Sequence, residues 1–211
     1  TMRDSYARRI LVEGVDLVGK TTLVTGLVEA LQLRRVDARR NAGPLHPGLV
    51  ARLATRRYRS GRDPRAPIQT WLFVGAAWHD VLCADRRGDG PIPVQEAGID
   101  HTIALAHALG RPIAAAAATA AAAWTPGFDA AILVTCDAAT RRARLAARPH
   151  ADALDRLLVD DPAAADHLEK VLHARVAARP NLLVLDSAAA PPDVLVARAL
   201  AHIDGELGRS L

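Results

Sequence analysis

The segment Glu13-Gly14-Val15-Asp16-Leu17-Val18-Gly19-Lys20-Thr21-Thr22 decides the fold class of this 211-residue chain. It contains the pattern G-x-x-x-x-G-K-[ST], with Gly14, Gly19, Lys20 and Thr21 at the four fixed positions. In loops of this kind the backbone N–H groups turn inward and surround phosphate oxygens. The segment therefore predicts a phosphate-binding loop.

The residues on either side of the loop supply the context that such a loop needs. Residues 10–12 (Ile-Leu-Val) form a short apolar run, which predicts a buried strand leading into the loop. Residues 21–33 carry apolar side chains at helical spacing, so a helix is expected to begin directly after the loop. A helix N-terminus also carries a positive partial charge that favours anions. The order strand, loop, helix distinguishes a phosphate-binding loop from a chance match.

Phosphoryl chemistry gives the side chains of this loop specific roles. Lys20 is expected to reach the β- and γ-phosphates of ATP and to follow the charge during transfer. The hydroxyl of Thr21 is expected to bind Mg²⁺. The predicted nucleotide site consists of Gly14, Val15, Asp16, Val18, Gly19, Lys20, Thr21 and Thr22. ATP and Mg²⁺ are therefore the expected cofactors.

The rest of the chain alternates between predicted strands and predicted helices. Further strands are expected at 36–38, 92–94, 130–134 and 182–185, and further helices at 49–58, 68–84, 99–109, 113–124, 138–147, 162–178 and 192–207. This alternation predicts an α/β fold of the P-loop NTPase type, with three layers (α/β/α) and a five-stranded parallel sheet. Because no linker or internal repeat is visible, we expect one domain over 1–211 with a small lid at about 148–160.

Composition restricts the partners and the location of the protein. The chain is 50% hydrophobic with a formal net charge of +4, and arginine supplies nearly all of the positive charge. No basic stripe interleaved with aromatic residues suggests a nucleic-acid partner. The longest apolar run, 113–124, is too short to span a bilayer, and residues 1–4 lack the apolar segment of a signal peptide. We expect a soluble, cytoplasmic protein with no membrane partner.

The phosphate-binding loop resembles that of the thymidylate kinase family, whose usual form is E-G-x-D-G-x-G-K-T-T. Asp16 is the informative match, because a carboxylate inside the loop lies near the transferred phosphate and can help to hold Mg²⁺ or the acceptor. Leu17 stands where the family has glycine, so a slightly different loop shape is expected. The resemblance continues more weakly over residues 9–205. It implies a P-loop kinase that forms a homodimer packed through helices.

Two further segments resemble the acceptor site of this family. Residues 72–79 look like its L-F-x-A-D-R segment, and residues 94–97 lie where it has a strand ending in Asp-Arg. Glu96 matches the acidic position, while Ala77 and Ala97 fall where the two acceptor-binding arginines would be. A carboxylate at the end of a parallel strand can hold a Mg²⁺-bound water or accept a proton from an attacking hydroxyl. Glu96 is therefore a candidate for both catalysis and metal binding.

The lid region contributes candidate arginines. Residues 144–148 resemble the family's R-I-x-x-R and residues 155–157 its D-R-F. Phosphoryl transfer spreads negative charge over the transferring group, and planar guanidinium groups stabilise that charge. We therefore predict catalytic roles for Arg148 and Arg156 and a nucleotide-binding role for Arg144. The alternative for each of them is a solvated arginine on a helix surface.

The predicted activity is ATP- and Mg²⁺-dependent phosphoryl transfer to a nucleotide, a nucleoside or a related small-molecule acceptor. Ala77 and Ala97 argue against thymidylate itself, although a phosphate-bearing acceptor could use Arg39, Arg40 or Arg52 instead. The alternative is a nucleotide-binding regulatory protein with reduced catalysis, because loss of transfer chemistry would leave such substitutions. A GTPase switch is a third reading, but the chain has no convincing N-K-x-D guanine motif.

Overall fold

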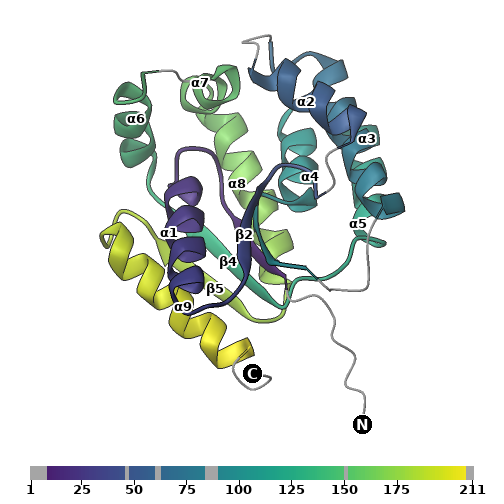
Figure 1. The fold of residues 1–211 in the computed structure, drawn as a ribbon. Coiled ribbons are helices and arrows are strands. Elements are labelled where there is room, and N and C mark those ends of the chain that lie inside the picture. The colour runs from purple at the N-terminus through teal and green to yellow at the C-terminus, as the bar shows by residue number, and fades with distance from the viewer. Residues whose placement is uncertain (1–8, 46–47, 60–62, 84–89, 150–151, 208–211) are drawn as a thin grey trace.

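A computed structural model describes residues 9–45, 48–59, 63–83, 90–149 and 152–207 of the chain. Within these ranges the strands form one parallel, five-stranded sheet in the order β2-β3-β1-β4-β5 (Figure 1). The strands are β1 (Ile10–Glu13), β2 (Ala38–Ala42), β3 (Ile92–Glu96), β4 (Ala130–Thr135) and β5 (Leu182–Asp186). The predicted α/β fold class is therefore confirmed.

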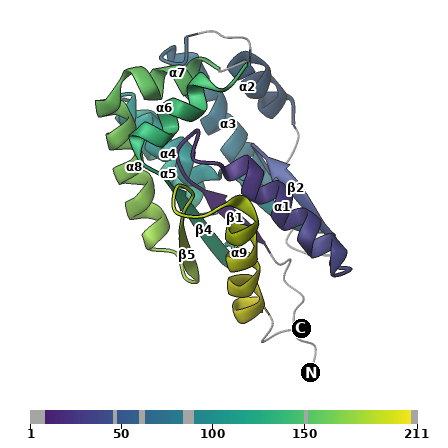
Figure 2. The ribbon, with the colours of Figure 1, turned by 90° about the vertical axis from the view of Figure 1, so that its left-hand side faces the viewer.

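Helices cover both faces of the sheet. They are α1 (Lys20–Leu33), α2 (Leu49–Arg59), α3 (Pro67–Cys83), α4 (Ile99–Ala108), α5 (Pro112–Ala122), α6 (Ala138–Ala146), α7 (Ala153–Asp160), α8 (Pro162–Ala177) and α9 (Pro192–Leu207). Figure 2 shows α1 and α9 on one face of the sheet and α4, α5 and α8 on the other. The remaining short helices α6 and α7, together with α2, lie at the carboxyl ends of the strands (Figure 1). In parallel α/β sheets this edge is the place where ligands bind.

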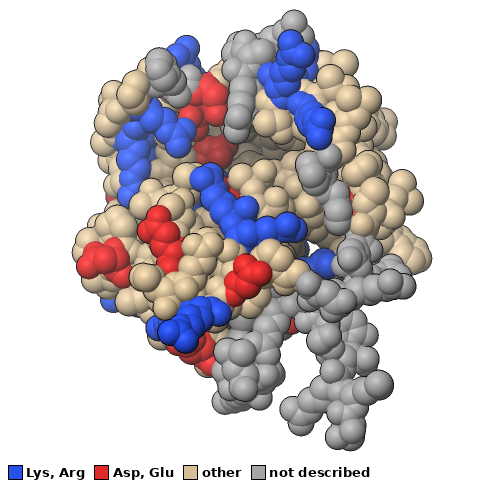
Figure 3. Space-filling model, viewed as in Figure 1, with Lys and Arg blue, Asp and Glu red and all other residues tan. Residues whose placement is uncertain are grey.

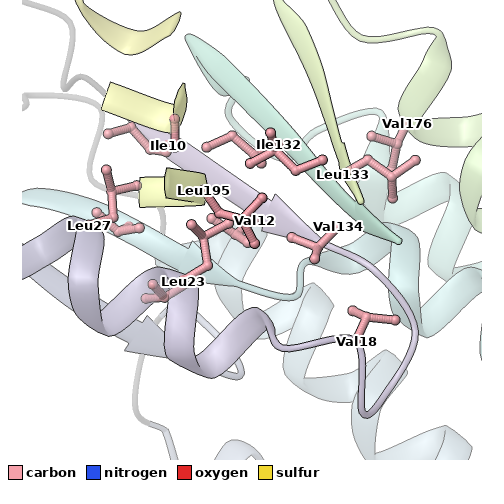
Figure 4. Packing of buried hydrophobic residues seen from close by; sticks show 14 of the residues in the cluster. Ile10, Val12, Val18, Leu23, Leu27, Ile132, Leu133, Val134, Val176 and Leu195 are labelled. Atoms are coloured by element: carbon pink, nitrogen blue, oxygen red, sulfur yellow. The ribbon is translucent and has the colours of Figure 1, made fainter. Parts of the chain in front are cut away.

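The core holds the strand that leads into the phosphate-binding loop. All four residues of β1 are fully buried. Ile10 and Val12 lie beside Leu23 and Leu27 of α1 and Leu195 of α9 (Figure 4). Burying one such aliphatic side chain stabilises the fold by about 1.5–3 kcal/mol. The start of the loop is thereby fixed by a tightly packed core.

The structure differs from the sequence-based expectation at two elements. The second strand was expected at 36–38 but runs from Ala38 to Ala42, with the polar sequence Ala-Arg-Arg-Asn-Ala. As an edge strand β2 pairs only with β3, so its polar side chains reach solvent and the hydrophobic pattern does not reveal it. Helix α7, inside the expected lid, was not predicted. No helix among the described residues is long and apolar enough to cross a membrane.

Candidate functional site

The loop between β1 and α1 adopts backbone conformations that glycine favours. Gly14 has a φ of 150°, and a Cβ atom there would lie 2.4 Å from the carbonyl oxygen of Val134. Gly19 has a φ of 97° and forms the N-cap of α1. Leu17 has a φ of 70°, which is the left-handed region that side chains disfavour. At Leu17 the loop therefore takes a backbone conformation that suits glycine. A leucine in this position, where the resemblance implied glycine, adds backbone strain.

The N-terminus of α1 is available to an anion. The Gly19 N-cap has no side-chain hydrogen bond, and the first turn of the helix contains no acidic residue. The first N–H groups of a helix have no partner within the helix, and their partial positive charge attracts phosphate. Lys20 lies over the same loop, with its ammonium group 2.7 Å from the Gly14 carbonyl oxygen and 2.8 Å from that of Val15. The backbone N–H groups at the start of α1 and the Lys20 ammonium thus both place positive charge at the phosphate-binding loop.

A cavity of about 540 Å³ opens beside this helix end, and we call it the donor cavity. Its wall includes the predicted nucleotide-binding residues Asp16, Gly19, Lys20, Thr21, Thr22 and Arg144. Gly14, Val15 and Val18 are not among its lining residues. Their carbonyl oxygens are turned inward, toward Lys20 for the first two and toward the Ser187 hydroxyl for Val18. These three residues shape the loop without facing the cavity.

Arg144 and Ser187 line the donor cavity and form hydrogen bonds to the carbonyl groups of the phosphate-binding loop. The Arg144 guanidinium donates to the carbonyl oxygen of Leu17 (3.0 Å) and to the hydroxyl and carbonyl oxygens of Ser187 (2.9 and 3.0 Å). The Ser187 hydroxyl in turn donates to the Val18 carbonyl oxygen at 2.6 Å. Ser187 could not be identified from the sequence, because its partner Val18 lies 169 positions away in the chain.

The lid places one of its two predicted arginines in the donor cavity and leaves the other outside. Arg148 lines the cavity and forms an ion pair with Asp155 at 2.5 Å. Asp155 is buried, and its carboxylate accepts a hydrogen bond from the backbone N–H of Asp152, the N-cap residue of α7. Burial raises the pKa of Asp155, and the Arg148 charge opposes that shift. Arg156, predicted as catalytic, is exposed and lines none of the cavities described, because α7 turns its other side inward.

Glu96 ends β3 beside the loop, as the resemblance implied. It pairs in register with Val12 of β1, the strand that leads into the phosphate-binding loop. The Thr21 hydroxyl donates a hydrogen bond to one carboxylate oxygen of Glu96. The guanidinium of Arg40 donates to the other oxygen from two nitrogens, at 2.9 and 2.7 Å. Both oxygens are therefore oriented, and the two predicted metal ligands, Thr21 and Glu96, are in contact.

These groups suit Mg²⁺ when a nucleotide supplies further oxygens. The described residues contain no group of three or more His, Cys, Asp or Glu side chains that could hold a metal ion. Mg²⁺ usually keeps several waters and takes one or two protein oxygens together with those of phosphates. Thr21 and Glu96 provide such oxygens in the donor cavity, and Asp16 lines the same wall. The site fits a nucleotide-bound Mg²⁺ and does not fit an all-protein cage.

A second cavity, of about 280 Å³, lies on the other side of Lys20, and we call it the acceptor cavity. Most of its wall is apolar, with Leu45, Phe73, Ala77, Ala97, Ile99, Leu105, Phe128 and Leu154 among the lining residues. Ala77 and Ala97 thus face one cavity, where the resemblance placed two arginines. Asp80 and His101 also line it, whereas the partly exposed Trp71 and Trp78 of α3 do not.

Asp16 carries negative charge at the boundary of the two cavities. Burial alone would raise the pKa of Asp16, but the charges of Lys20 and His101 outweigh it, and the net pKa lies below its ordinary value. Burial lowers the pKa of His101, although the Asp16 carboxylate opposes that shift. The Nε2 atom of His101 lies 3.9 Å from Asp16. We therefore assign an ionised Asp16 between the Lys20 ammonium and the His101 imidazole.

Gln95 is a structural residue of the acceptor cavity that the sequence reasoning missed. Its amide nitrogen donates to the carbonyl oxygens of Gly43 (2.6 Å) and Ala97 (2.7 Å), and its oxygen accepts from Asn41 at 2.5 Å. It thereby ties the end of β2 to the turn after β3. A glutamine directly after the apolar residues 92–94 of a predicted strand was the available signal, because a polar group buried there needs partners.

The donor and acceptor cavities meet at three charged residues. Asp16, Lys20 and Glu96 line both of them. Two carboxylates and one ammonium therefore border both a group bound in one cavity and a group bound in the other. This is the arrangement that phosphoryl transfer between two bound molecules needs, because catalysis there consists of positioning and charge stabilisation.

Comparison with known proteins identifies the fold. No protein-family model matches the sequence, and no curated protein matches it. Among solved structures, thymidylate kinase from Candida albicans superposes with a TM-score of 0.69 and covers 95% of this chain and 92% of its own. The two sequences are 14% identical. At that identity the likeness shows a thymidylate-kinase-like fold and nothing finer.

Proposed function

We propose that this protein is an ATP- and Mg²⁺-dependent phosphotransferase that moves the γ-phosphate of ATP to a nucleotide, nucleoside or related small molecule. The observation that carries the proposal is the meeting of the two cavities at Asp16, Lys20 and Glu96. The donor cavity has a helix N-terminus for phosphate, and the acceptor cavity has apolar walls for an organic body. The fold shared with a thymidylate kinase is consistent with this assignment.

The residues at the junction divide the chemistry among them. Lys20 stabilises negative charge on the transferring phosphoryl group. Glu96 accepts the proton of an attacking hydroxyl, and Arg40 and Thr21 hold its carboxylate in place for that step. Arg148 adds positive charge from the lid. Bound Mg²⁺ would neutralise charge on the phosphate oxygens, held on the protein side by Thr21 and Glu96.

The test joins a binding measurement to a screen for turnover. Calorimetry should show that Lys20→Ala weakens Mg²⁺-ATP binding at least about tenfold, because the loop loses its principal cation. The parent protein should release ADP faster in the presence of one class among nucleosides, nucleoside monophosphates and small hydroxyl or carboxylate metabolites. Unchanged ATP affinity in Lys20→Ala would contradict the donor site. ATP binding without acceleration by any acceptor would favour the regulatory alternative.

We also propose a homodimer that packs through α3. Ile68, Trp71, Trp78 and Leu82 are 54%, 47%, 36% and 82% exposed, and their spacing puts them on one side of the helix. Large exposed apolar side chains on one side of a helix, tryptophans included, are typical of an interface. Light scattering after gel filtration should give a dimer that Trp71→Ser with Leu82→Ser converts to a monomer. Leu33→Ser, at an equally exposed position on α1, should leave the dimer intact.

A further inference from the structure

A third hollow, of about 830 Å³, adjoins the acceptor cavity and is unusually rich in arginine. We call it the arginine hollow. It is lined by Arg39, Arg40, Asn41, Ala42, Pro44, Leu45, Ala51, Arg52, Thr55 and Arg56, which include no acidic residue. Figure 3 shows Lys and Arg side chains over α2 and over β2 on this face of the molecule. The hollow therefore concentrates positive charge where the wall supplies no negative charge.

Most of this charge is not neutralised by the protein. Within the described part of the chain, the side chains of Arg39, Arg52 and Arg56 form no hydrogen bond or ion pair, whereas Arg40 binds Glu96. Arg52 and Arg56 lie four positions apart on α2, where like charges oppose each other, and the first turn of α2 has no acidic residue. An anion bound in the hollow would relieve that repulsion.

The arginine hollow continues the acceptor cavity and not the donor cavity. It shares Ala42, Pro44, Leu45 and Thr55 with the acceptor cavity, and it shares no lining residue with the donor cavity. The acceptor cavity is at the small end of the range for ligand sites, so a larger acceptor would extend past Thr55 into the hollow. An anion in the hollow would therefore lie outside the donor cavity, in which the transferred phosphoryl group is proposed to bind.

We propose that the arginine hollow binds a phosphate group carried by the acceptor at the end away from the transfer point. A guanidinium group can donate two N–H groups to phosphate oxygens, and the three that have no carboxylate partner, Arg39, Arg52 and Arg56, favour a dianionic phosphate ester over a single carboxylate. This inference rests on the proposed function, since it names the class of its acceptor. The acceptor is then a phosphorylated metabolite whose own phosphate ester is left unchanged while its other end is phosphorylated.

Inorganic phosphate is the probe for a direct test. It is titrated by calorimetry into the protein after Mg²⁺ and a non-hydrolysable ATP analogue have filled the donor site, with acetate as the comparison anion. The double variant Arg52→Gln with Arg56→Gln should weaken phosphate binding at least about tenfold. The matched control, Arg35→Gln with Arg198→Gln, removes the same charge from exposed arginines outside the three cavities. Its affinity for phosphate should stay within about threefold of the parent.

Three outcomes would overturn the proposal. They are no phosphate binding by the parent, equal loss in both double variants, and acetate binding as tight as phosphate binding. The titration measures phosphate binding and needs no turnover, so failure of the hollow to bind phosphate can be distinguished from failure of the proposed phosphotransferase activity. Once an acceptor is found, Arg52→Gln with Arg56→Gln should raise its KM and preserve kcat. An acceptor that turns over equally well without its phosphate would also contradict the inference.

Discussion

The hydroxyl of Thr21 donates a hydrogen bond to the carboxylate of Glu96, although the two residues are 75 positions apart in the chain. This contact joins the first turn of α1 to the end of β3. Arg40, on β2, holds the other carboxylate oxygen. Three elements that converge at the carboxyl edge of the sheet therefore position one acidic group, which lines the donor and the acceptor cavities at once.

Glu96→Gln should reduce turnover and leave nucleotide binding in place. The amide keeps the shape of the side chain but cannot accept a proton, and general-base catalysis contributes about 10²- to 10⁴-fold. We expect kcat for a hydroxyl acceptor to fall within that range while the ATP dissociation constant changes little. Glu29→Gln, an exposed position on α1 that lines no described cavity, is the matched control. Activity of Glu96→Gln within a few-fold of the parent would remove Glu96 from the mechanism.

The two lid arginines should behave differently on substitution. Arg148 lines the donor cavity and Arg156 does not, so Arg148→Gln should lower kcat by about 10²-fold or more and Arg156→Gln should have little effect. Removing Arg148 also leaves the buried Asp155 carboxylate without its ion-pair partner. The free energy of unfolding of Arg148→Gln should therefore fall, and Arg148→Gln with Asp155→Asn should recover much of the loss. Equal activity of Arg148→Gln and Arg156→Gln would contradict a catalytic role that belongs to Arg148 and not to Arg156.

The first strand and the glycine-containing loop after it could be predicted from sequence because their signals are local. Residues 10–12 are apolar without interruption, and the glycine spacing of the next ten residues has few structural interpretations. The clear helices were found for the same reason, since an apolar side recurs every three or four residues. Helix α7 was missed although Asp152 and Asp155 form a capping box at its start. Its eight residues are too few for a helical pattern to stand out.

Parts of the site that depend on distant contacts could not be predicted. Gln95, Ser187 and Arg40 each bind at least one partner more than forty positions away, and nothing in the local sequence specifies those distant partners. Asp100 shows the opposite case, because its residue type suits a binding site while its contacts are structural. It is buried and bound by Arg175 and Arg179 of α8. Residue type identified a candidate carboxylate there, and only packing showed that its role is structural.

Glu13 should make the stability of the fold depend on pH. Burial raises its pKa to about 7 from an ordinary value of 4.5, against the hydrogen bond from the Gly98 N–H. Between pH 4.5 and about pH 7 the Glu13 carboxyl holds its proton in the folded state and loses it in the unfolded state. The free energy of unfolding therefore falls as the pH rises through this range. The shift corresponds to a loss of about 3 kcal/mol across this window.

Glu13→Gln removes the titration and keeps an oxygen for the Gly98 N–H. Urea unfolding of parent and variant at pH 5 and pH 8 isolates this group, because the other titrating residues are common to both proteins. The variant should gain stability relative to the parent as the pH rises. A difference between the two proteins that is the same at both pH values would show that Glu13 titrates normally.

Leu17 offers a test of strain in the phosphate-binding loop itself. Its φ of 70° costs a residue with a Cβ about 1–2 kcal/mol, and glycine avoids that cost. Leu17→Ala and Leu17→Gly both lose the buried leucine side chain, so their difference reports the backbone alone. Leu17→Gly should be the more stable of the two by about 1 kcal/mol in urea unfolding. At the exposed Ala116 of α5 the order should reverse, with glycine about 1 kcal/mol less stable than alanine. Equal stability of the two Leu17 variants would mean that the loop relaxes around this position and that the left-handed conformation is not imposed on it.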